Sequence, residues 1–336
     1  MLIQKSIVHT PVGSRQAAIG HEELAAWVAL HSVGSLGAGA LGRLLARFGS
    51  PGGVLAASPE ELYAVPKVPR LVLDGVRRAA RDLGRHRAAV RRLVAEGIQA
   101  VRREDAAYPA RLNVLASPPP LLYVRGRLPR DNRRTFGIVG TREPSERGAE
   151  VAAAVARYLA RHGWVIVSGN AQGIDAAAHC AALAARRPTV LVLPAGIFQF
   201  RPHAGYPPPD ALWQRAAAVS ECHPEAPWTT PAAMARNRLI AALSDAVLVV
   251  ECRERGGAIS TARHAIALGR RVFVVRFRAP SLSAAGNAAV EAAGAAPIRS
   301  LRDLETLLTH DPPRPSTGSG RAEPVEARQG QRDLPW

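Results

Sequence analysis

From Thr135 onward, short apolar runs alternate with longer amphipathic stretches. The runs have the length of β-strands, and the stretches between them have the length of helices. Because each run is apolar throughout, we expect a parallel sheet that is covered on both faces. The predicted strands are 135–140, 164–168, 189–194, 218–221, 246–251 and 271–275, and the predicted helices are 147–162, 173–186, 209–217, 231–243 and 258–269.

Right-handed crossovers between such strands produce an α/β fold, an extended Rossmann-like doubly wound parallel sheet. The chain before it has a different pattern. Residues 22–95 have helical periodicity, with Ser58 expected to cap one helix and residues 71–95 expected to form the last one, so they predict a small all-helical domain. The predicted organisation is a tail at 1–21, the helical domain at 22–95, an extended β-connector at 96–134, the Rossmann-like domain at 135–310 and a disordered tail at 311–336.

Composition narrows the class of protein. The chain has 336 residues, of which 47% are hydrophobic, so a wholly disordered chain is excluded. Three cysteines are too few and too far apart for a disulfide scaffold. Lys+Arg 44 against Asp+Glu 27 leaves a net charge of +17, which favours a polyanionic partner, with nucleic acid first and an anionic membrane second.

Targeting and metal signals are missing from the sequence. The first residues lack the apolar segment of a secretory signal, and no run approaches the length of a membrane span. No CxxC pair or His/Cys cluster has zinc spacing. We therefore predict a cytoplasmic protein with reduced thiols, no metal and no membrane partner.

The first predicted strand ends in Gly140-Thr141-Arg142. A strand, a glycine turn and then a helix form a phosphate-binding layout, and the Arg142 guanidinium is suited to clamp a phosphate. An ordinary tight turn with a solvated arginine fits the same residues. The turn is not GxGxxG, so we predict no dinucleotide cofactor.

The second predicted strand ends in Ser168-Gly169, and Gly173 and Asp175 open the next helix. The carboxyl ends of neighbouring parallel strands face one crevice, where open α/β sheets bind ligands. Ser168 either contacts a phosphate or caps the turn. Asp175 either supports the pocket or complements the helix dipole.

Two further motifs lie at the same predicted edge. Arg236-Asn237-Arg238 falls on an apolar helix, and the next strand ends at Glu251 before Gly256, Gly257 and Thr261. Glu251 is either a general base or a structural acid. Together with the first two turns, these segments predict an anion-binding crevice, with Asp175, Glu251, Gly256, Gly257 and Thr261 supporting the pocket.

The motif series VGTREPSERG, SGNAQGIDAAAH, ARNRLIAALSDAVLVVE and GGAISTARHAIALGRRVFVV resembles that of the DprA/Smf family of DNA-processing proteins. VGSLGAGALGRLLARFGSPGGVLAASPEEL is similar to that family's sterile-alpha-motif-like helical domain. The resemblance implies a non-catalytic protein that binds single-stranded DNA, forms a homodimer and loads RecA recombinase during natural transformation. It also implies phosphate contacts from Gly140, Thr141 and Arg142, from Ser168, Gly169 and Gly173 of the loop that Asp175 supports, and from Arg236, Asn237 and Arg238.

One segment departs from the family pattern. Where the family has Gly-Leu-Asp-x-x-Tyr-Pro, this chain has GIFQFRP at 196–202. Arg201 and His203 keep a basic character there, so we expect them to contact phosphate. Phe198 and Phe200 are candidates to stack on bases, and packing in the core is the alternative for each.

Two other functions fit parts of the sequence. Nucleotide phosphoribohydrolases share the Rossmann-like superfamily, and their glycine loop is similar to Gly256-Gly257-Ala258-Ile259-Ser260-Thr261, with Glu251 as the only candidate base. The third hypothesis is a divergent DprA/Smf member that binds duplex DNA or another nucleotide. We predict binding to single-stranded DNA, without catalysis, as the function.

Overall fold

The computed structural model describes residues 20–34, 36–309 and 336. The predicted tail at 1–21 and the predicted disorder of 311–336 therefore lie almost wholly outside the described residues. The chain divides into two compact units, Met1–Val90 and Arg91–Trp336, and the division falls inside helix α6 (Leu83–Ala95).

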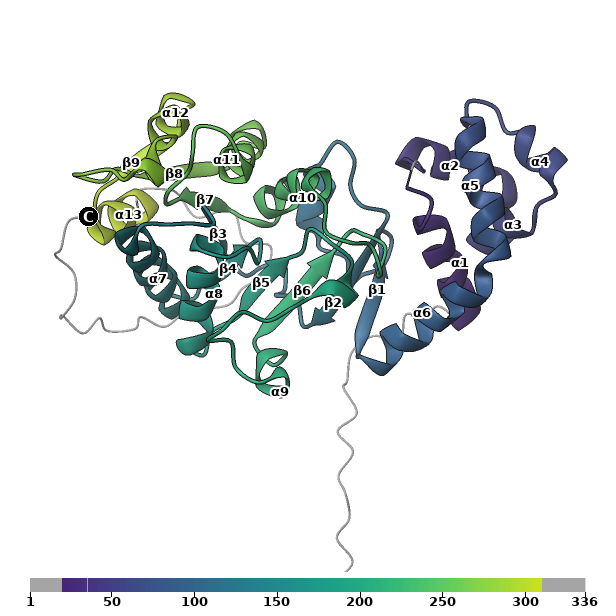
Figure 1. Ribbon diagram of the computed structural model, residues 1–336, viewed down its shortest axis with the longest axis horizontal. Helices are drawn as coiled ribbons and strands as arrows, with labels where there is room; N and C mark the ends of the chain where they lie inside the picture. The colour runs from purple at the N-terminus through teal and green to yellow at the C-terminus, as the bar shows by residue number, and fades with distance from the viewer. Residues whose placement is uncertain (1–19, 35, 310–335) are drawn as a thin grey trace, which may run out of the picture. The chain divides into compact units, whose positions relative to one another are not determined.

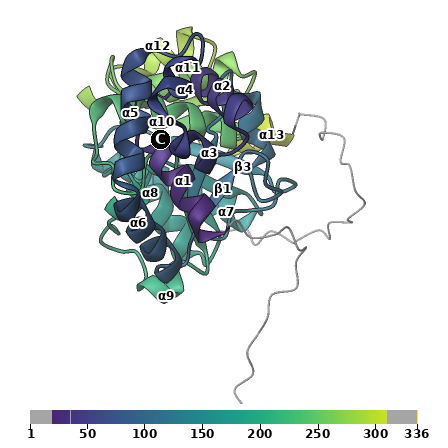
Figure 2. The ribbon, with the colours of Figure 1, turned by 90° about the vertical axis from the view of Figure 1, so that its right-hand side faces the viewer.

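The first unit is helical, as predicted. Helix α1 packs against α3 and α5 (Figure 2). Ser58 caps α4: its hydroxyl accepts from the Glu61 N–H at 3.2 Å, while the Glu61 carboxylate accepts from the Ser58 N–H at 2.8 Å. This reciprocal capping box confirms the predicted helix start. The helices are α1 (His21–His31), α2 (Ala38–Phe48), α3 (Pro51–Ala56), α4 (Pro59–Tyr63), α5 (Arg70–Arg81) and the first part of α6.

The single helix predicted over 71–95 is wrong in one respect, because the structure divides it at Asp82. The Asp82 N–H ends α5 by donating to the Arg78 carbonyl at 3.1 Å. The Asp82 carbonyl then accepts from the Arg85 N–H at 2.9 Å and starts α6. Aspartate is favoured at the starts of helices. One helix therefore ends and the next begins at Asp82, although the helical periodicity of the sequence continues through it.

The second unit is built on one sheet of nine strands in the order β1-β2-β6-β5-β4-β3-β7-β8-β9 (Figure 1). All pairs from β6 to β9 in this order are parallel, which confirms the Rossmann-like class. The strands are β1 (Ile98–Arg102), β2 (Leu121–Gly126), β3 (Thr135–Val139), β4 (Val165–Ser168), β5 (Thr189–Val192), β6 (Ala216–Ser220), β7 (Ala246–Val249), β8 (Arg271–Val275) and β9 (Ala296–Ile298).

The segment predicted as a connector, 96–134, is part of this sheet. Strand β1 pairs antiparallel with β2, and β2 pairs antiparallel with β6. Between them, Tyr108 is buried and its hydroxyl donates to the Pro119 carbonyl at 2.9 Å. The prolines that indicated extended pieces therefore belong to an antiparallel extension of the sheet.

Helices cover both faces of the sheet. Helices α7 and α8 lie on one side of the strands, and α10 and α11 lie on the other (Figure 1). The helix predicted at 209–217 is only α9 (Pro209–Leu212), because β6 begins at Ala216. The helices are α7 (Glu146–Arg161), α8 (Ile174–Ala184), α9, α10 (Thr230–Leu243), α11 (Gly257–Ala267), α12 (Asn287–Ala292) and α13 (Leu301–Thr309), with short 3-10 turns at Ala110–Val114, Ile197–Gln199 and Leu282–Ala284. Three late elements were not predicted from the sequence pattern: α12, β9 and α13.

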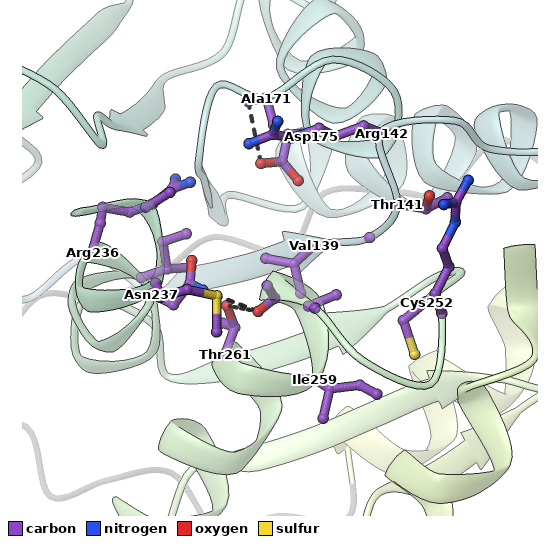
Figure 3. A pocket seen from close by; sticks show the side chains of 18 of the residues that line it. Val139, Thr141, Arg142, Ala171, Asp175, Arg236, Asn237, Cys252, Ile259 and Thr261 are labelled. Atoms are coloured by element: carbon purple, nitrogen blue, oxygen red, sulfur yellow. Dashed lines mark hydrogen bonds between the residues drawn. The ribbon is translucent and has the colours of Figure 1, made fainter. Parts of the chain in front are cut away.

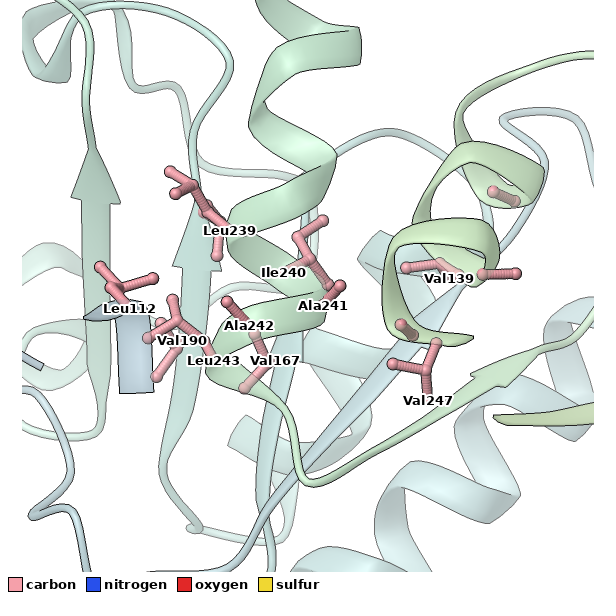
Figure 4. Packing of buried hydrophobic residues seen from close by; sticks show 14 of the residues in the cluster. Leu112, Val139, Val167, Val190, Leu239, Ile240, Ala241, Ala242, Leu243 and Val247 are labelled. Carbon is pink, nitrogen blue, oxygen red and sulfur yellow. The ribbon is translucent and has the colours of Figure 1, made fainter. Parts of the chain in front are cut away.

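Helix α10 is held by a layer of buried apolar side chains. Leu239 and Ile240 are almost wholly buried and pack toward the sheet, with Val167 and Val190 in the same cluster (Figure 4). Burial of each such side chain contributes about 1.5–3 kcal/mol relative to exposure. The 3-10 turn that contains Leu112 also packs against the helix, and Leu112 belongs to the same buried cluster. This packing fixes α10, and therefore fixes the polar residues on its first half.

Candidate nucleic-acid interface

A pocket of about 400 Å³ opens at the carboxyl ends of β3, β4 and β7. Strand β3 is the first strand of the parallel set in the chain, and it lies between β4 and β7 in the sheet. The chain direction across the sheet therefore reverses at β3. Ligands of open α/β sheets bind at such a reversal point, and the pocket lies in this position, as expected from the sequence.

The loop after β3 packs closely against the end of β7 and the start of α8. The Thr141 N–H donates to the Glu251 carbonyl at 2.7 Å. A Cβ at Gly140 would lie 2.5 Å from Cγ1 of Ile174, so only glycine fits there. Arg142 follows on the pocket rim with an exposed side chain, and its guanidinium carbon lies 5.1 Å from the centre of the Trp228 ring.

The loop after β4 is organised by one buried carboxylate. Asp175, near the start of α8, accepts from the N–H of Gly169 at 3.0 Å and from the N–H of Ala171 at 3.4 Å (Figure 3). Gly173 has a positive φ of 77°, which glycine adopts without strain. Asp175 therefore shapes the loop, lies in the first turn of α8 and lines the pocket. Its support of a bound ligand stays a prediction.

Arg236 forms the floor of the pocket beneath this loop. It is buried, and its Nη1 donates to the Val192 carbonyl at 2.7 Å. A Cβ at Gly169 would lie 1.8 Å from that nitrogen, so the loop rests directly on the guanidinium. Burial lowers the pKa of Arg236 to about 10 although Asp175 opposes the shift, and burial raises the pKa of Asp175 although Arg236 opposes that shift. The two charges stabilise each other inside the protein.

Helix α11 presents its N-terminus to the pocket. Asn237 Nδ2 donates to the Gly257 carbonyl at 3.2 Å, and the Thr261 hydroxyl donates to the same carbonyl at 3.0 Å. Gly256, with φ at 147°, and Gly257 line the pocket. In the described part of the chain no side chain caps this helix, so its first N–H groups are open to an anion.

Sequence reasoning missed two arginines of the rim, Arg253 and Arg255. Both line the pocket and are exposed. Arg253 forms an exposed ion pair with Glu143, whereas neither Arg142 nor Arg255 has a carboxylate partner within residues 20–34 and 36–309. The basic run Arg253-Glu254-Arg255 between a strand and a glycine pair was the signal that could have identified them.

Several predicted phosphate ligands lie outside this pocket. The Ser168 hydroxyl is buried and donates to the Ile138 carbonyl. Arg201 donates to the carbonyls of Phe198 and Phe200, and a ring nitrogen of His203 lies 3.0 Å from the Asn170 carbonyl. Their contact with phosphate stays a prediction, and the bonds that the structure shows are local.

Arg238 and the two candidate stacking residues also lie away from the pocket. Arg238 pairs with Glu221, two positions along α10 from the buried Arg236. Phe198 is buried beneath the Arg92 guanidinium, 3.9 Å from the ring centre. Phe200 is half-buried against Trp213. The structure therefore places both phenylalanines in packing contacts, and their stacking on bases stays a prediction.

Glu251 is a structural carboxylate in this arrangement. It is buried and accepts four hydrogen bonds, from the N–H and hydroxyl of Ser145 and from the hydroxyls of Ser281 and Ser283. A Cβ at Gly148 would lie 2.5 Å from the carboxylate carbon, so the backbone of α7 packs directly against the carboxylate. Glu251 therefore joins the end of β7 to the start of α7 and does not line the pocket.

Within the described residues, no three His, Cys, Asp or Glu side chains are placed to hold a metal ion. The cysteines Cys180, Cys222 and Cys252 are free thiols. None of the helices in this part of the chain is both long and apolar enough to span a bilayer.

Comparison with known proteins assigns the family. The chain is 35% identical over 184 residues to DNA processing protein DprA of Bacillus subtilis, which covers 54% of this chain and 61% of that protein. It is 39% identical over 181 residues to Protein Smf of Synechocystis, covering 51% and 44% of the two chains. The chain thus spans 61% and 44% of the lengths of these two curated relatives.

Two solved structures support the fold. DNA processing protein A from Streptococcus pneumoniae superposes with a TM-score of 0.65 at 24% identity, covering 86% of this chain and 98% of that one. DNA processing protein A from Helicobacter pylori, described for its single-stranded DNA binding mode, superposes with a TM-score of 0.54 at 29% identity, covering 63% and 96%. A family model described as DNA recombination-mediator protein A matches residues 99–309. The predicted family is confirmed, and the chain belongs to the DNA recombination-mediator protein A family.

Proposed function

We propose that the chain binds single-stranded DNA through the pocket at β3, β4 and β7, and that it protects incoming strands and loads RecA recombinase on them during natural transformation, as a homodimer. One observation supports the binding step above the others. The uncapped start of α11 shares a pocket with Arg142 and Arg255, which have no carboxylate partner in the part of the chain that the structure describes.

Phosphate is the group that these donors fit. Helix N–H groups and guanidinium groups bind a phosphate diester whatever base it carries, so binding is independent of sequence. The pocket contains four arginines against two carboxylates, Glu143 and Asp175. An anion entering it therefore meets a net positive charge.

The enzymatic alternative has less support. A phosphoribohydrolase needs a carboxylate that faces its substrate, and Glu251 is held by four hydrogen bonds outside the pocket. Asp175 does line the pocket, but its carboxylate accepts the loop N–H groups of Gly169 and Ala171. Incubation with AMP, followed by chromatography for free base, tests catalysis directly.

Salt titration of DNA affinity tests the binding step. We expect tight binding to single strands of any sequence. The logarithm of the binding constant should fall with the logarithm of the salt concentration, with a slope of about 0.7 for each phosphate contacted. Arg142→Ala should weaken all sequences alike and lower this slope by about 0.7. Arg157→Ala removes an exposed arginine on α7, away from the pocket, and serves as the matched control.

Three results would contradict the binding proposal. They are a flat salt response, preference for the duplex of the same sequence, and an equal loss in the Arg142 and Arg157 variants. Pull-down of RecA with the protein on single-stranded DNA, followed by a strand-exchange assay, tests the loading step. Sedimentation of the full chain tests the homodimer.

A further inference from the structure

Trp228 is the aromatic side chain of the pocket in the described part of the chain. It is 47% exposed, which is unusual for so large an apolar group. The residue after it, Thr229, caps α10 by accepting from the Ala232 N–H at 3.2 Å. Trp228 therefore projects from a point that the capped helix holds in place.

Trp228 also contacts Arg142, one of the exposed arginines that line the pocket. The Arg142 guanidinium lies over its ring, with 5.1 Å between the guanidinium carbon and the ring centre. This cation–π contact aligns the arginine with the indole, while nearly half of the indole surface stays accessible. A phosphate on Arg142 would bring its own nucleotide close to the ring.

We propose that Trp228 stacks on an unpaired base of the bound strand, beside the phosphate that Arg142 holds. The inference rests on the proposed binding of single-stranded DNA in this pocket. Every base has a π-face, so stacking adds affinity without sequence preference. The bases of a duplex are already stacked and paired, so Trp228 favours single strands over duplexes.

The other aromatic candidates are less suited to this contact. Phe198 is buried under Arg92, and Phe200 packs against Trp213. Trp164 makes the same kind of cation–π contact, with the Arg134 guanidinium carbon 4.6 Å from its ring centre. However, Trp164 precedes β4 and therefore lies at the amino edge of the sheet, opposite the pocket. It provides a matched control.

The test combines a substitution in the protein with the removal of the bases from the DNA strand. Affinity of the full chain is measured for oligothymidylate and for an abasic strand of equal length, which keeps the phosphates and lacks the bases. Trp228→Ala should weaken oligothymidylate binding by about 5- to 150-fold. It should leave abasic binding and the salt slope unchanged, and Trp228→Phe should retain most of the affinity.

Three outcomes would overturn the inference. Equal loss on both strands, with a lower salt slope, would mean that Trp228 only positions Arg142. No loss on either strand, or the same loss in Trp164→Ala, would mean that the indole touches no base. A wild-type protein that fails to bind either strand would instead refute the proposed function. Thermal melts of all variants verify that they are folded.

Discussion

The floor and the rim of the pocket use the same residue type in different ways. In the floor, Arg236 is buried, faces Asp175 and donates to a carbonyl. On the rim, Arg142 and Arg255 are exposed and have no ion pair in the described residues. A buried guanidinium stabilises the loop that shapes the site, whereas the exposed guanidinium groups lie where the proposed DNA would reach them. Variants of the floor should affect folding, and variants of the rim should affect binding.

The largest effect is expected in the floor. Arg236→Met leaves Asp175 buried without its counter-charge, which should reduce the free energy of unfolding by about 3–5 kcal/mol. Urea denaturation measures the loss. Adding Asp175→Asn should restore part of it, because the uncompensated charge is then removed. An unchanged midpoint in Arg236→Met would mean that the floor does not depend on this pair.

The second effect is a pH dependence of stability from His179, beneath the same loop. Burial lowers the pKa of His179 to about 3, and His203 and Arg236 add to the shift. An unfolded histidine titrates near 6.5, so between pH 6.5 and about 3 the unfolded chain binds the extra proton. This part of the stability is present above pH 6.5 and falls by about 1.4 kcal/mol per pH unit on acidification.

Denaturation curves across this pH range test the contribution. The slope of stability against pH should be smaller in His179→Asn than in the wild type. His162→Asn, on the surface, reports the cost of losing an exposed histidine. Parallel curves for wild type and His179→Asn would show that the buried imidazole is not the source.

The smallest effect on stability is expected on the rim. Arg255→Ala should leave the unfolding free energy within about 0.5 kcal/mol of wild type and lower the salt slope of DNA binding by about 0.7. Arg253→Ala should lower the slope less, because Glu143 already neutralises that arginine. Anisotropy titrations compare the two. An equal effect of both would show that the ion pair opens when DNA binds.

Much of the parallel sheet could be predicted from the sequence. The apolar run at Arg271–Val275 is a strand with the predicted bounds, because buried parallel strands leave a continuous apolar pattern. The pairing of β2 with β6 could not be predicted, since it joins segments far apart in the chain. Within the site, the glycine turns were recognisable. The burial of Arg236 and the exposure of Trp228 depend on how α10 packs, which no local pattern records.

The antiparallel extension of the sheet has a consequence for the order of folding. Strand β2 ends at Gly126, and its partner β6 begins at Ala216, 90 positions later. During synthesis, the backbone groups on one edge of β2 have no strand partner until β6 leaves the ribosome. We expect chains cut before Ala216 to aggregate through this open edge, which light scattering of such fragments would reveal. The late arrival of β6 makes completion of the sheet a step that waits for most of the chain.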